Sequence, residues 1–141
     1  MSLPDSVLTK AIPQMSNSEK SEYARFTING QTSMMLLEPL QNAANIIRSH
    51  MELYNCKGFP DRLAADAIPK PSRILLIVCD YAELQREQNF LGEPLSEKDS
   101  RTYLIKLAGQ RYDRELVDIF IETLECYNGG AISSTERLNI A

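Results

Sequence analysis

The sequence predicts an all-α protein, a single helical bundle of about five to six helices. Apolar residues recur at helical spacing, most clearly at Ala43, Ile46 and Ile47, and His50 falls on the same face. The strongest apolar run, Ile74–Val78, has no second segment that could pair with it as a strand. Because an isolated strand leaves its backbone hydrogen bonds unmade, that run is also expected to be helical.

A chain of 141 residues holds one domain with a real core and is too short for two. We expect a helical domain over residues 16–127. It should follow an extended lead-in over residues 1–15, which contains two prolines, and precede a flexible tail over residues 128–141.

The first helix is expected to begin at Ser16, because Ser16 and Glu19 have the spacing of a capping box. It should carry Tyr23 and Phe26 on its inner side. Asn29–Gly30 is then expected to interrupt it.

A second helix is expected to bury Met34, Met35 and Leu37 before Pro39 interrupts it. The third helix begins after Leu40, and its periodicity predicts that His50 points inward with the apolar stripe.

Residues 55–71 predict a loop, because glycine and proline punctuate them. A helix over Arg73–Leu84 follows, and residues 89–95 break the pattern again. Ser96 then opens a helix that ends at Gly109 and buries Tyr103, Leu104 and Leu107.

Asp113 is expected to cap the last helix. Its apolar face should be formed by five residues, Leu116, Val117, Phe120, Ile121 and Leu124.

Composition excludes several function classes. The net charge is −4 and the basic residues are scattered, which disfavours binding to nucleic acid. No run approaches the ~18 apolar residues of a membrane span, and the first residues lack the apolar core of a signal peptide. Cys56, Cys79 and Cys126 form no CxxC pair, so we expect reduced thiols in a cytoplasmic protein.

The residues by themselves support little chemistry. A catalytic metal needs about three converging ligands, but His50 is the single histidine, and Glu52, two positions on, should point away from it. Cys79 is expected to be an inert thiol in an apolar helix. Three carboxylates remain candidates for acid–base work, Asp61, Asp66 and Asp80.

One segment nevertheless resembles a known pattern. Gly58-Phe59-Pro60 is followed, at the spacing of that pattern, by Ile68-Pro69 and Arg73-Ile74-Leu75, with Tyr112-Asp113 further on. This order resembles the C-terminal part of an HD-GYP domain, a metal-dependent hydrolase family of bacterial cyclic di-GMP signalling. The resemblance spans most of residues 3–125 and implies a helical bundle.

The departures from that pattern imply a degenerate member. The family's metal-binding positions fall at Phe26, His50, Met51 and Cys79, and of these only histidine is a usual ligand of the family. We therefore expect no bound metal or other cofactor, no enzymatic activity, and a former metal cavity filled by packed core.

The resemblance implies a catalytically inactive signalling output or interaction domain of a bacterial response regulator or sensor. Its partner or ligand loop would contain six residues: Lys57, Gly58, Phe59, Pro60, Arg62 and Arg73. Cyclase-type protein domains are the partners implied, and a homodimer is expected because a half-domain should leave apolar surface uncovered.

Two alternatives stay open. One is a sensor that binds a cyclic dinucleotide without hydrolysing it, with Arg73 near a phosphate. The other is a metal-dependent phosphodiesterase that takes its missing ligands from elsewhere.

Overall fold

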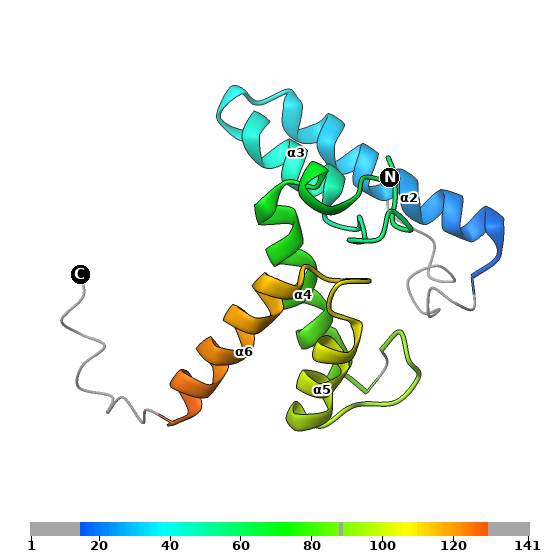
Figure 1. Cartoon of the computed structure of the whole chain (residues 1–141). Coiled ribbons are helices and arrows are strands. Elements are labelled where there is room, and N and C mark those ends of the chain that lie inside the picture. Colours follow the sequence, from blue (N-terminus) through cyan, green and yellow to red (C-terminus); the bar gives the residue numbers. More distant parts are fainter. Residues whose placement is uncertain (1–14, 88, 130–141) are drawn as a thin grey trace.

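The computed structural model describes residues 15–87 and 89–129, with only the backbone of residues 128 and 129, and its regular structure is helical (Figure 1). The α-helices are α2 (Asn17–Met35), α3 (Gln41–Ser49), α4 (Lys70–Leu84), α5 (Glu97–Leu107) and α6 (Arg114–Gly129). Two 3₁₀ turns, η2 (Glu38–Leu40) and η3 (Ala65–Ala67), lie between them. The described residues contain no strand, which confirms the all-α prediction. Nearly all of the expected lead-in and tail lies outside the described residues.

The helices form two groups joined by α4 (Figure 1). Helices α2 and α3 lie side by side, and α4 leads from this pair to α5 and α6. The main apolar core lies between α4, α5 and α6 and consists of seven buried residues: Leu76, Ile77, Leu104, Ala108, Tyr112, Leu116 and Val117. The loop between α3 and α4 spans the junction of the two groups.

Helix α2 begins as predicted and ends later than predicted. The Ser16 side chain accepts a hydrogen bond from the Glu19 N–H at 3.2 Å, and the Glu19 carboxylate accepts one from the Ser16 N–H at 2.8 Å. The expected interruption at Gly30 is wrong, because this glycine serves helix packing. A Cβ at Gly30 would lie 2.9 Å from Cγ2 of Ile47, so its absence lets α2 and α3 approach closely.

Continuation of α2 overturns two further expectations. The predicted second helix does not form, and residues 36–40 instead make the turn into α3, with Pro39 in the first turn of η2. Met35 and Leu37 are exposed, because this turn projects beyond the contact between the two helices. The inward prediction is also wrong for Phe26, which is 48% exposed, while Tyr23 is half-buried.

Helix α4 confirms the prediction for the long apolar run. It begins three residues before Arg73, with Pro71 in its first turn, where the missing N–H of proline costs nothing. The predicted loop therefore ends at Pro69. The helix is buried along one side only, so Val78 and Cys79 are exposed, and the expectation that Cys79 lies in apolar core is wrong.

The last two helices begin where their caps predict. The Ser96 hydroxyl accepts from the Asp99 N–H at 3.1 Å, and Asp113 accepts from the Glu115 N–H at 3.1 Å. Gly109 has φ +83° in the turn between them, a conformation that favours glycine. Within the described ranges, no helix combines the length and apolar character needed to cross a membrane.

Candidate functional site

The loop after α3 forms one wall of a cleft of about 620 Å³. Helix α2 contributes a second wall, and single residues of α4 and of the turn before α6 complete it. The described lining is largely apolar, with Ala24, Met51, Leu53, Gly58, Phe59, Pro60 and Leu76. It also includes Ser21, Cys56 and four cationic residues: Lys20, Lys57, Arg62 and Arg111.

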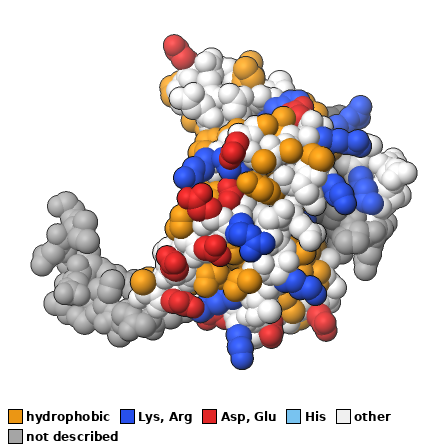
Figure 2. All heavy atoms as spheres, in the orientation of Figure 1, with side chains coloured by type: hydrophobic (Ala, Val, Ile, Leu, Met, Phe, Trp, Pro, Cys, Tyr) orange, Lys and Arg blue, Asp and Glu red, His pale blue; other side chains and the backbone are white. Residues whose placement is uncertain are grey.

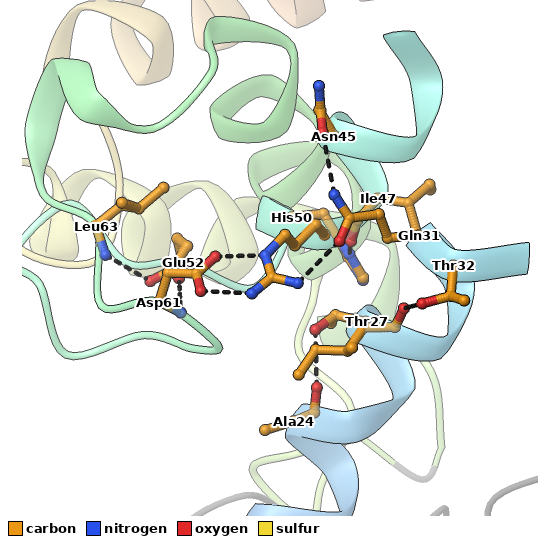
Figure 3. Close-up of polar contacts among 12 residues, drawn as sticks. Ala24, Thr27, Gln31, Thr32, Asn45, Ile47, His50, Glu52, Asp61 and Leu63 are labelled. Atoms are coloured by element: carbon orange, nitrogen blue, oxygen red, sulfur yellow. Dashed lines mark hydrogen bonds and ion pairs between the residues drawn. The ribbon is translucent and has the colours of Figure 1, made fainter. Parts of the chain in front are cut away.

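A buried carboxylate holds this loop in shape. Glu52 is 1% exposed, and its two oxygens accept hydrogen bonds from the Asp61 N–H at 2.6 Å and the Leu63 N–H at 3.1 Å (Figure 3). These bonds fold the far side of the loop back over the end of α3. Burial raises the pKa of Glu52, although the same backbone N–H groups act to lower it.

Gly58 lies directly against the chain that carries this carboxylate. A Cβ there would lie 2.2 Å from the Leu53 nitrogen and 2.5 Å from the Glu52 Cα. Only glycine fits this position, because no rearrangement of a side chain could relieve a clash with backbone.

A polar network attaches the loop to helices α2 and α3 (Figure 3). Arg48 of α3 donates two hydrogen bonds to Asp61, each of 2.6 Å. Its third nitrogen donates to Gln31 of α2 at 2.8 Å, and Gln31 in turn donates to Asn45 at 3.1 Å. The Arg48 guanidinium also lowers the pKa of Asp61. The loop is therefore a braced element of the fold.

Phe59 is turned toward the protein. Its ring packs edge to face on Tyr23 of α2, with 5.6 Å between ring centroids, and it is half-buried. This contact connects the cleft wall to α2.

Arg111 reaches the cleft from a part of the chain that sequence reasoning did not single out. The Tyr54 N–H donates to the Arg111 carbonyl at 3.1 Å, and the Asn55 N–H donates to the Gln110 carbonyl at 2.9 Å. These two bonds fasten the cleft loop to the turn before α6. Lys20 was also missed, because in sequence it is an ordinary exposed residue of an amphipathic helix.

The electrostatics of the cleft favour anions. Its described lining carries four cationic side chains and no carboxylate, although the chain as a whole is acidic. A cleft lined by charge of one sign concentrates ligands of the opposite sign. The apolar walls and the Phe59 ring suit a ligand that has flat apolar groups beside its negative charges.

The four positions expected to be remnants of a metal site differ in burial and in the groups that they contact. His50 is half-buried with Nδ1 2.6 Å from the Ile47 carbonyl oxygen, and Met51 lines the cleft. Phe26 and Cys79 are both exposed, so the expected conversion of the cavity into packed core is wrong for them. Although Cys79 is exposed as a residue, partial desolvation of its sulfur raises the pKa of the thiol, with Asp80 and Glu83 adding to the effect.

These residues do not fit a metal site of the kind the family implies. Benzyl and thioether side chains occupy two of the four positions, and His50 already uses one ring nitrogen. Among the described residues, no three His, Cys, Asp or Glu side chains converge as metal ligands would.

Arg73 lies outside the cleft lining. Its Nη1 contacts Asp113 at 2.6 Å and Asp66 at 2.9 Å, so it connects α4 to the start of α6 and to η3. Its role toward a ligand stays a prediction. The three carboxylates considered for acid–base work are all paired: Asp61 with Arg48, Asp66 with Arg73, and Asp80 with Arg111.

The raised pKa of Glu52 predicts a pH effect on stability. In the unfolded chain the pKa of Glu52 has its ordinary value of 4.5, and the folded state holds the proton to higher pH. Stability from the protonated form is thus fully present below that value and is lost as pH rises through the folded pKa. We expect the unfolding free energy of the wild type, minus that of Glu52→Gln, to fall across this window.

Urea denaturation of both proteins between about pH 4 and about pH 8 measures this difference. Subtraction removes the contribution of Asp61, which is common to both. A difference that stays constant or rises with pH would contradict the assignment.

Comparison with known proteins agrees with the loop pattern. A family model of the HD domain matches residues 1–116. The chain is also similar to the 3'3'-cGAMP-specific phosphodiesterase 2 of Vibrio cholerae serotype O1, with 28% identity over 83 residues. That alignment covers 59% of this chain and 16% of the relative, so the chain spans only a small part of the relative's length. Because the family model matches most of the chain, the chain belongs to the HD domain family, as an HD-GYP-like member.

Proposed function

We propose that this chain is a non-catalytic HD-GYP-like signalling domain that binds a cyclic dinucleotide in the cleft beside the Gly58-Phe59-Pro60 loop. The observation that carries the proposal is the set of four cationic residues on a largely apolar cleft without a described carboxylate. A cyclic dinucleotide has two phosphates and two flat bases, which match those two features. The similarity to a 3'3'-cGAMP-specific phosphodiesterase supports the same ligand class.

The proposed absence of catalysis rests on the donor set. A phosphodiesterase of this family needs metal, and Phe26 and Met51 cannot supply the ligands that their positions imply. The chain would thus report the ligand to other parts of a response regulator or sensor and leave it intact.

The binding experiment is calorimetric titration of the purified protein with 3'3'-cGAMP and, separately, cyclic di-GMP. We expect at least one to bind, and we expect Lys57→Gln and Arg62→Gln each to weaken binding about tenfold or more, since a charge-assisted hydrogen bond contributes about 1.5–3 kcal/mol. Lys98→Gln is the matched control, because Lys98 is exposed on α5 and does not line the cleft.

Two results would contradict the proposal. One is the absence of binding by both nucleotides. The other is recovery of linear dinucleotide or mononucleotide products when the protein is incubated with added Mn²⁺, which would mean that the chain is a phosphodiesterase.

A protein-interaction role is the second candidate, and exposed apolar residues at the turn between α2 and α3 favour it. Four of them gather there, Met35, Leu36, Leu37 and Leu40, and Leu36 is 82% exposed. In the space-filling view, hydrophobic side chains lie at the surface of this end of the molecule (Figure 2). A cyclase-type domain or a second copy of the chain would then be the partner, and failure of both nucleotides to bind would favour this role.

A further inference from the structure

Arg111 is fixed in place by both its backbone and its side chain. Its carbonyl accepts the Tyr54 N–H, and its Nε donates to Oδ2 of Asp80 at 2.7 Å. The guanidinium carbon also lies 5.4 Å from the centroid of the Phe90 ring and 5.7 Å from that of Tyr112. An arginine with this many restraints holds one orientation before any ligand arrives.

The same restraints act through Nε and the ring faces, and they leave the outer edge of the guanidinium, Nη1 and Nη2, pointing away from Asp80's bond to Nε. Within the described part of the chain, the hydrogen bond of normal geometry from the Arg111 side chain is the one from Nε to Asp80, and the Tyr112 hydroxyl is a second polar neighbour of the guanidinium. Neither terminal nitrogen is buried without a partner, and Arg111 lines the cleft. No hydrogen bond of normal geometry joins Nη1 or Nη2 to a described residue, so this edge of the guanidinium is the part that can meet a molecule in the cleft.

The chemistry of that edge selects its ligand. A guanidinium presents two N–H donors in a planar fork whose spacing matches two oxygens of one phosphate. Burial lowers the pKa of Arg111, but the Asp80 carboxylate outweighs it and raises the pKa overall, so the fork stays charged. Prior orientation by Asp80 also reduces the entropy that is lost on binding.

We propose that Arg111 is a ligand-binding residue that takes one phosphodiester group of the cyclic dinucleotide through Nη1 and Nη2, an inference that rests on the proposed function. The Asp80 bond sets the plane of the fork, and the Tyr54 and Asn55 bonds bring it to the Gly58-Phe59-Pro60 loop. The other three cations of the cleft remain for the second phosphate.

The competing explanation is that Arg111 only neutralises Asp80. Arg111→Lys separates the two roles, because lysine keeps the charge beside Asp80 but offers no bidentate fork. We expect Arg111→Lys to melt within a few degrees of the wild type and to bind 3'3'-cGAMP about tenfold or more weakly. Arg111→Gln should lose binding further, and Arg86→Lys, an exposed arginine outside the cleft, is the matched control.

A neutral analogue identifies the group that Arg111 contacts. Two versions of 3'3'-cGAMP, each with one linkage replaced by an uncharged methylphosphonate, are titrated into the wild type and into Arg111→Lys. For one analogue, we expect the wild type to bind about tenfold more weakly than it binds 3'3'-cGAMP. Arg111→Lys should bind that analogue and 3'3'-cGAMP with nearly the same affinity, because the contact is already absent in the variant.

Each outcome decides a different statement. If the wild type binds 3'3'-cGAMP and Arg111→Lys binds it equally well, the role of Arg111 is overturned and the proposed function stands. The same holds if, for both analogues, the loss caused by the substitution and the loss caused by the neutral linkage simply add. Failure of the wild type to bind 3'3'-cGAMP and cyclic di-GMP overturns both.

Discussion

Replacement of Gly58 by alanine is expected to destabilise the protein by roughly 3 kcal/mol or more, at the upper end of the cost of overpacking. The added Cβ would lie 2.2 Å from the Leu53 nitrogen and 2.6 Å from the Glu52 carbonyl carbon, so backbone must move. Any such movement displaces the Glu52 carboxylate from the two N–H groups that it holds. The cleft should be lost together with stability, because Gly58 and its neighbours form its wall.

Urea denaturation gives the free energy of unfolding, and titration with 3'3'-cGAMP reports the cleft. Gly92→Ala is the control, because a Cβ there meets nothing within 4 Å and only the φ of +96° opposes it. That conformational cost is roughly 1–2 kcal/mol for an alanine. Equal losses in the two variants would show that close approach is not what requires glycine at position 58.

Asp80→Ala is the second large effect, with an expected loss of about 2–4 kcal/mol. The Asp80 carboxylate accepts from Nε of Arg111 at 2.7 Å and from the Tyr112 hydroxyl at 2.8 Å. Its removal leaves a cation and a hydroxyl without their partner beside the main core. The estimate stays below the full cost for a buried pair because the Arg111 side chain is 18% exposed and can turn toward water in the cleft.

Thermal and urea denaturation measure this loss against Glu83→Ala in the same helix. Glu83 pairs with Arg86 at 3.1 Å, but both side chains are far more exposed, so that variant should lose about 0–1 kcal/mol. Asp80→Asn should fall between the two, because its amide oxygen can still accept from Tyr112. A loss from Asp80→Ala no larger than from Glu83→Ala would contradict a structural role for the Asp80–Arg111 pair.

Local chemistry determined much of the fold in advance. Ser16, Ser96 and Asp113 each begin a helix as their sequence contexts predict, because a capping side chain bonds to N–H groups only two or three residues away. The apolar run of α4 is helical because no partner strand exists to satisfy it as a strand. The loop around Gly58-Phe59-Pro60 was also located by its pattern.

Contacts between residues far apart in the sequence determined the features that the sequence alone did not predict. Gly30 predicts a break when only its neighbours are considered, but its contact with Ile47 turns it into a packing position. The faces of Phe26 and Cys79 were mispredicted because periodicity fixes which residues share a side and does not fix how much of that side is covered.

The cleft shows the same division. The sequence by itself determined the loop that carries Lys57 and Arg62, together with the helices on each side of it. Tertiary structure alone brought Lys20 and Arg111 to that loop, through helix packing and through backbone bonds between residues 54–55 and 110–111. Hydrogen bonds between distant segments leave no periodicity or spacing in the sequence, so the full cationic lining could be recognised only in the folded chain.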